Sequence, residues 1–73
     1  MKILYVLWQD ACFQGDALKT EELCDKFEVE SIGFLVRETP KILSIAQDYQ
    51  KTIDKWRSIT HIPKSLIKKR KCL

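Results

Sequence analysis

Residues 28–46 read EVESIGFLVRETPKILSIA and decide the fold of this chain. From Glu28 to Val36 the pattern has a period of two, which is that of a β-strand. One set of alternate residues changes from polar to apolar along the stretch, from Glu28 and Glu30 to Ile32, Phe34 and Val36. Gly33 interrupts this strand, and a glycine inside a strand is typical of a bend or a bulge. Thr39-Pro40-Lys41 then predicts a tight turn with proline at its second position. Leu43, Ile45 and Tyr49 alternate with Ser44 and Ala46 beyond it, so the stretch predicts a β-hairpin.

Further strands are predicted on both sides of this hairpin. The apolar run Ile3–Trp8 is typical of a strand buried on both faces, or of a central strand in a tightly curved sheet. Trp56–Ile62 alternates again and stops at Pro63, because proline cannot continue a central ladder. After a brief turn at Lys64-Ser65, Leu66–Leu73 predicts a last and strongly basic strand. Between the first strand and the hairpin, Asp16–Phe27 has helical spacing with Asp16 as a cap, and it predicts one short helix or a structured loop.

Five short strands joined by short turns predict a mainly β fold, a small closed or half-closed barrel of the SH3-like or Sm-like class. The 73 residues allow a single domain, residues 1–73, with no room for a second core. A chain of this length buries only about 60% of its unfolded surface. Small domains of this kind commonly rely on disulfides, a metal or a partner subunit. We therefore expect a homo-oligomer.

The cysteines and glycines limit the chemistry that this chain can carry. Cys12, Cys24 and Cys72 are odd in number and show no paired CxxC spacing, which argues against a disulfide framework and against a zinc site. We expect Cys12 and Cys24 to be small buried hydrophobic residues in a reducing environment. Gly15 and Gly33 form no phosphate-binding loop, and we expect no cofactor.

No targeting or membrane segment is expected. The run Ile3–Trp8 is too short for a signal-peptide core. No stretch approaches the roughly 20 apolar residues of a membrane helix. The expected location is the cytoplasm, of a cell or of an infected host, with no membrane partner.

Several short motifs give the chain a family resemblance. They are Trp8-Gln9-Asp10-Ala11, the strand Ser31-Ile-Gly-Phe-Leu-Val36, the strand Ile42-Leu-Ser-Ile-Ala46 and the closing Ile62-Pro-Lys-Ser-Leu-Ile67. In these motifs the chain is similar to short proteins encoded by phages and mobile elements. The resemblance implies a phage-type accessory protein and no particular activity. The order of strands also resembles that of Sm-like RNA-binding proteins, although the Asn- or Lys-containing loop pair that holds a uridine there is not found.

Catalysis is not the leading interpretation, because His61 is the only histidine and no nucleophile lies at a recognisable spacing from it. A dyad of Cys12 and His61 with Asp10 would make a small Cys/His hydrolase. This hypothesis is weak, because short motifs of this kind give many false positives. His61 is more readily a half-buried strand residue with a satisfied ring nitrogen. We therefore expect a protein that is not an enzyme.

The candidate ligand-binding residues are aromatic, acidic or basic side chains near strand ends. Trp8 and Trp56 pack in a core or an interface, or stack on a ligand. Asp10 begins a turn, or accepts hydrogen bonds from a ribose or a base. Surface charges serve solubility, or form a phosphate-binding surface. The full candidate set is Trp8, Asp10, Arg37, Trp56, Arg57, His61 and Lys64.

The charge of the chain is modest, +3, but it is unevenly placed. Acidic residues cluster in residues 16–30, and the run Lys68, Lys69, Arg70 and Lys71 lies near the end of the sequence. The leading hypothesis is a non-catalytic binding protein that interferes with a host process, as a host-defence inhibitor would. It would sequester a small phosphorylated signal, such as a nucleotide, or occupy a host macromolecule. The alternative is an Sm-like nucleic-acid-binding protein that uses the basic run.

Overall fold

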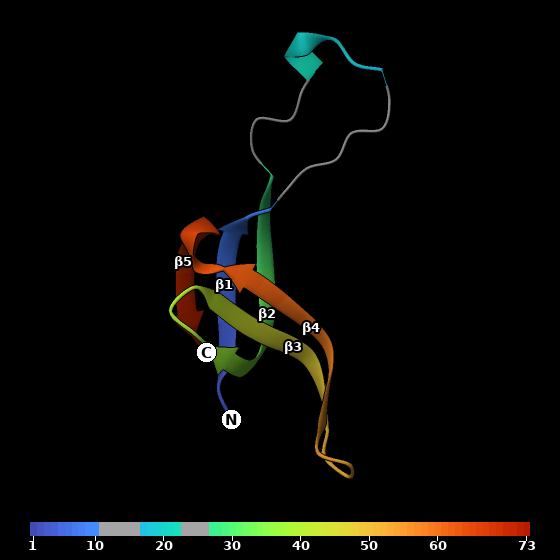
Figure 1. The fold of residues 1–73 in the computed structure, drawn as a ribbon, viewed down its shortest axis with the longest axis vertical. Coiled ribbons are helices and arrows are strands. Elements are labelled where there is room, and N and C mark those ends of the chain that lie inside the picture. Colours follow the sequence, from blue (N-terminus) through green and yellow to red (C-terminus); the bar gives the residue numbers. More distant parts are fainter. Residues whose placement is uncertain (11–16, 23–26) are drawn as a thin grey trace.

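The computed structural model describes residues 1–10, 17–22 and 27–73. Its elements are β1 (Ile3–Gln9), the 3-10 turn η1 (Thr20–Glu22), β2 (Glu28–Glu38), β3 (Ile42–Gln50), β4 (Lys55–Pro63), the 3-10 turn η2 (Lys64–Leu66) and β5 (Ile67–Cys72). All five strands join one antiparallel sheet in the order β4-β3-β2-β1-β5 (Figure 1). The predicted mainly β fold with five strands is confirmed. No ladder joins β4 to β5, so the sheet is open rather than a closed barrel.

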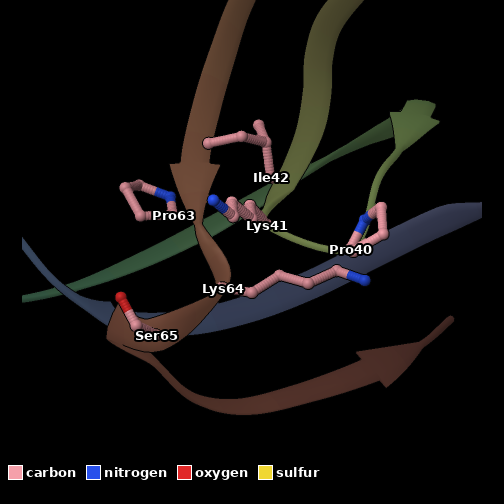
Figure 2. Close-up of a pocket in the computed structure, with 6 residues that line it drawn as sticks. All are labelled: Pro40, Lys41, Ile42, Pro63, Lys64 and Ser65. Carbon is pink, nitrogen blue, oxygen red and sulfur yellow. The ribbon is translucent and has the colours of Figure 1, made fainter.

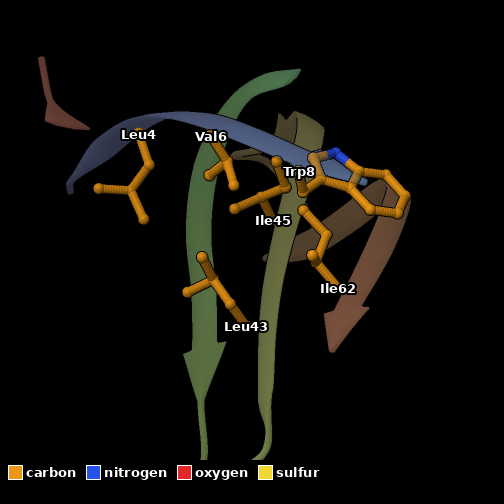
Figure 3. Packing of buried hydrophobic residues seen from close by; sticks show 6 residues of the cluster. All are labelled: Leu4, Val6, Trp8, Leu43, Ile45 and Ile62. Atoms are coloured by element: carbon orange, nitrogen blue, oxygen red, sulfur yellow. The ribbon is translucent and has the colours of Figure 1, made fainter. Parts of the chain in front are cut away.

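The sheet curves so that β1 lies across from β3 and β4, and the core fills the space between them (Figure 3). Its buried side chains are Leu4, Val6 and Trp8 from β1, with Leu43 and Ile45 from β3 and Ile62 from β4. Burial of these side chains is the main source of stability in so small a domain. Because the sheet is curved, its own strands enclose the core, and no second layer of secondary structure is needed to bury it.

Only one face of β1 is buried. Leu4, Val6 and Trp8 point into the core, whereas Ile3 on the other face remains 39% exposed. The prediction of burial on both faces was wrong, and β1 is instead a central strand of a curved sheet. The physical reason is that no second layer of the described residues covers the outer face.

The irregularity in β2 is not at Gly33. Gly33 pairs regularly with Leu4, and the register shifts between Leu35 and Arg37 instead. Gly33 has a different role, because a Cβ placed there would lie 2.7 Å from the carbonyl oxygen of Ala46. The glycine allows the backbone of β3 to approach β2 closely where the sheet folds over.

The segment predicted as a short helix or structured loop is described only in part. Residues 17–22 contain the 3-10 turn η1, whereas Asp16, Cys12 and Cys24 lie outside the described residues. What the sequence predicts for these three residues, including the Cys12–His61 dyad, therefore stays a prediction. Within the described ranges, no helix is long and apolar enough to cross a membrane.

Candidate functional site

Two Pro-Lys dipeptides meet at one end of the β3–β4 hairpin. Ile42 pairs with Pro63, which brings Pro40-Lys41 alongside Pro63-Lys64. The backbone N–H of Lys64 donates to the carbonyl oxygen of Lys41 at 2.8 Å and fixes the two segments together. Between them lies a hollow of about 440 Å³, which we term the Pro-Lys hollow (Figure 2). It is lined by Pro40, Lys41, Ile42, Pro63, Lys64 and Ser65.

The turn that forms one wall of the hollow is held by Thr39. Its backbone N–H donates to the carbonyl oxygen of Ile42 at 2.8 Å, and its hydroxyl oxygen accepts from the backbone N–H of Ile42 at 3.0 Å. Pro40 adds rigidity, because its ring fixes one backbone torsion. The wall is therefore shaped before any ligand arrives, which lowers the entropy cost of binding.

A cluster of charges joins the hollow to the last strand. The Glu38 carboxylate accepts from Lys64 Nζ at 2.6 Å and from the two terminal nitrogens of Arg70 at 2.8 and 3.2 Å. Hydrogen bonds from Arg70 first and Lys64 second lower the pKa of Glu38 from 4.5 to about 2. Lys64 and Arg70 therefore share one carboxylate, and Lys41 adds a second lysine to the lining of the hollow. The hollow is therefore electropositive and suits an anion.

Of the predicted ligand-binding residues, only Lys64 lines the hollow. Trp8 lies in the core at 7% exposure, and its indole N–H donates to the Ser31 hydroxyl oxygen at 3.1 Å. Asp10 follows β1, where its backbone N–H donates to the carbonyl oxygen of Phe27 at 2.8 Å. These three residues do not form one site.

Arg37 and His61 lie in one row across the outer face of the sheet, on either side of Ser44. Ser44 pairs with Arg37 in β2 and with His61 in β4. The Ser44 hydroxyl and the His61 Nδ1 atom lie 2.6 Å apart. Ser44 is only 1% exposed, so its hydroxyl is shielded from a substrate. Among the described residues, no carboxylate hydrogen-bonds the imidazole, and the pair serves to join β3 to β4.

Trp56 and Arg57 lie in the far half of the β3–β4 hairpin. The Trp56 ring packs against Tyr49 and Phe34, with ring centroids 4.7 and 6.3 Å away. Arg57 forms an exposed ion pair with Asp48 at 3.2 Å. Tyr49, the partner of Trp56, follows Ile42 by seven residues along β3. At about 3.3 Å per residue this is some 23 Å from the Pro-Lys hollow. Trp56 and Arg57 therefore do not belong to it.

The basic run of β5 is divided between two faces. Lys69 and Lys71 pair with Leu7 and Tyr5 on the outer face. Arg70 pairs with Val6, points to the opposite side and binds Glu38. Lys68 is the extra residue where the register shifts. The four cations therefore do not form one continuous surface.

The sequence interpretation missed Glu38 and the binding potential of Lys41. The repeated Pro-Lys dipeptide, at residues 40–41 and 63–64, was a usable signal, because both copies end a predicted hairpin strand. The sequence around Glu38 does not predict its ion pairs, since its partners Lys64 and Arg70 lie 26 and 32 residues further along the chain.

Within residues 1–10, 17–22 and 27–73, no group of three or more His, Cys, Asp or Glu side chains is placed to hold a metal ion. Comparison of the chain with family models, with curated proteins and with solved structures finds no match.

Proposed function

We propose that this chain is a non-catalytic binding protein that sequesters a small phosphorylated molecule in the Pro-Lys hollow. The observation that carries the proposal is the meeting of Lys41 and Lys64 across one preformed hollow. Its volume of about 440 Å³ lies within the range of about 300–1,000 Å³ that is usual for small-molecule sites. A nucleotide-sized ligand is therefore a suitable occupant.

The two kinds of group around the hollow match the two parts of such a ligand. Lys41 and Lys64 supply ammonium groups for the phosphate, and Lys64 also pairs with Glu38. Pro40, Ile42 and Pro63 supply an apolar wall for a base or a sugar. Glu38 balances only part of this charge, so an arriving phosphate would be attracted rather than repelled.

Removal of a signal from solution needs affinity and no chemistry. In a phage-type accessory protein in the cytoplasm of an infected host, this activity would interfere with a host process. The finer fold assignment, an SH3-like or Sm-like barrel, is also a proposal. It is supported by the curvature of the sheet and by the tight turn η2 between the last two strands.

Calorimetric titration tests the proposal, with inorganic pyrophosphate and with nucleotides extracted from cells as probes. The wild-type chain should bind one of them, and Lys41→Gln or Lys64→Gln should weaken binding about tenfold or more, as expected for loss of a charge-assisted contact of about 1.5–3 kcal/mol. Lys55→Gln is the matched control, because Lys55 is an exposed lysine that lies outside the hollow. Binding that is unchanged in both hollow variants would contradict the proposal.

A second candidate function is nucleic-acid binding by β5. It is favoured by one observation, that Lys69 and Lys71 lie on an open sheet face beside Tyr5 and form no ion pair with a described residue. Aromatic and basic side chains on one face are typical of single-strand binding. In that case Lys69→Gln and Lys71→Gln would each reduce the slope of the logarithm of the RNA-binding constant against the logarithm of the salt concentration by about one unit. Lys41→Gln would leave RNA binding unchanged, which separates the two functions.

A further inference from the structure

The outer face of β1 and β2 is the face that turns away from the core. Directly opposed residues in antiparallel strands place their side chains on the same face. The pairs on this outer face are Ile3–Phe34, Tyr5–Ile32, Leu7–Glu30 and Gln9–Glu28, and β5 adds Lys71 beside Tyr5 and Lys69 beside Leu7.

The centre of this face is apolar and partly exposed. Ile3 is 39% exposed and Ile32 is 53% exposed. Leu7 and Phe34 are half-buried beside them. Ile59, 41% exposed, continues the row through Ala46. A contiguous apolar area on a soluble domain commonly marks a surface that a partner covers.

The charges on this face are arranged in two columns, one on each side of β1. Lys69 lies on β5, Glu30 lies on β2, and Leu7 separates them. Neighbouring strands are about 4.8 Å apart, so these two charged columns are about 10 Å apart. The Tyr5 hydroxyl donates to Glu30 Oε2 at 2.9 Å, which fixes the carboxylate on this face. Lys69 forms no ion pair with any described residue.

This arrangement is complementary to itself. A second copy turned by 180° about an axis parallel to β1 presents its basic column to the acidic column of the first copy. With the axis over β1, Ile3, Tyr5 and Leu7 then face their own counterparts, and Lys71 of each copy faces Ile32 of the other. Each contact between different residues occurs twice, as in a symmetric dimer. Charge complementarity of this kind fixes the register of an interface and excludes other partners.

We propose that a second copy of this chain docks on the outer face of β1 and β2, with Lys69 of each copy opposite Glu30 of the other. The proposal is independent of the Pro-Lys hollow, which lies at the β2–β3 turn and η2. In the dimer Lys69 is committed to a carboxylate. Self-association and RNA binding by β5 are therefore alternatives, and only one of them can use this face at a time.

Sedimentation equilibrium at micromolar concentration tests the dimer by charge reversal. The wild-type chain should be a dimer, and Lys69→Glu or Glu30→Lys should each raise the dimer dissociation constant at least tenfold, because like charges then face each other at both symmetric contacts. An equimolar mixture of the two variants should recover a dimer, since each reversed charge then meets an opposite one. Lys55→Glu, an exposed lysine on β4, should leave the association unchanged.

The double variant Glu30→Lys with Lys69→Glu distinguishes loss of the interface from a folding defect. Such a defect could arise because Glu30 also accepts a hydrogen bond from Tyr5. It should dimerise as the wild type does, because it restores both contacts within one chain. Three results would overturn the proposal. They are a monomeric wild-type chain, single variants that associate as tightly as the wild type, and a chain that gains mass only when single-stranded RNA is added.

Discussion

Replacement of Gly33 by alanine should destabilise the fold, although alanine usually favours a strand more than glycine does. A Cβ at this position would lie 2.7 Å from the carbonyl oxygen of Ala46 and 3.3 Å from Ile45 Cβ, and ordinary contact begins at 3.4 Å. The backbone of β3 would have to move by up to 0.7 Å, the difference between 3.4 and 2.7 Å. The closest atom belongs to the backbone, so no side-chain rotation can relieve the contact.

The magnitude follows from two opposing effects. Overpacking of this kind costs about 1–3 kcal/mol, and the lower entropy of the unfolded alanine chain returns about 0.4–1 kcal/mol. A net loss of about 1.5 kcal/mol lowers the melting temperature by roughly 6–12 °C in a domain of this size. Thermal unfolding followed by circular dichroism measures this shift.

Two further substitutions sharpen the test of the close approach. Gly33→Ser should lower the melting temperature at least as much as Gly33→Ala, because its side chain is larger. Lys55→Ala on exposed β4 should change the stability by no more than about 0.5 kcal/mol. A Gly33→Ala chain that melts at or above the wild-type temperature would refute the close approach of β3 to β2 as the reason for this glycine.

Two predictions concern titration. Because the folded-state pKa of Glu38, about 2, lies below the unfolded value of 4.5, its ion pairs stabilise the fold above pH 4.5 and are lost as the pH falls toward 2. Urea unfolding across this range should show the loss in the wild type and a flatter profile in Glu38→Gln, and equal profiles would contradict the prediction. Tyr5 and Tyr49 donate to Glu30 and Asp54, and these hydrogen bonds raise both tyrosine pKa values above 10. The midpoint at which the tyrosinate absorbance of each ring appears should therefore lie above pH 10, whereas an ordinary midpoint for both rings would be incompatible with these bonds.

Local patterns in the sequence were sufficient for the strands but not for the arrangement of their side chains. Alternation from Glu28 onward and the Pro40 turn predicted the β2–β3 hairpin, which the structure has. A bend or a bulge was expected at Gly33, because local patterns do not reveal that β3 passes close to this residue. Its position near Val36 depends on how the curved sheet packs, which is a property of the whole fold.

The candidate site was predictable only at one residue, Lys64. The cations of the sequence look equivalent, but the fold gives them different partners. Arg57 binds Asp48, Lys64 and Arg70 share Glu38, and Lys69 stays on the open face. These partners are set by contacts between distant segments, and no spacing along the chain encodes them. Trp8 illustrates the same limit, since a tryptophan that suits a ligand site also suits a core.

The most direct test of the central claim is to map ligand binding on the chain by nuclear magnetic resonance. The backbone amide signals of a nitrogen-15-labelled chain are followed during titration with inorganic pyrophosphate. The largest shifts should belong to Lys41, Ile42, Lys64 and Ser65, which line the Pro-Lys hollow, and these shifts should disappear in Lys64→Gln. Shifts confined to Lys69 and Lys71 on β5, or no shifts with either pyrophosphate or extracted nucleotides at millimolar concentration, would contradict the proposed binding site.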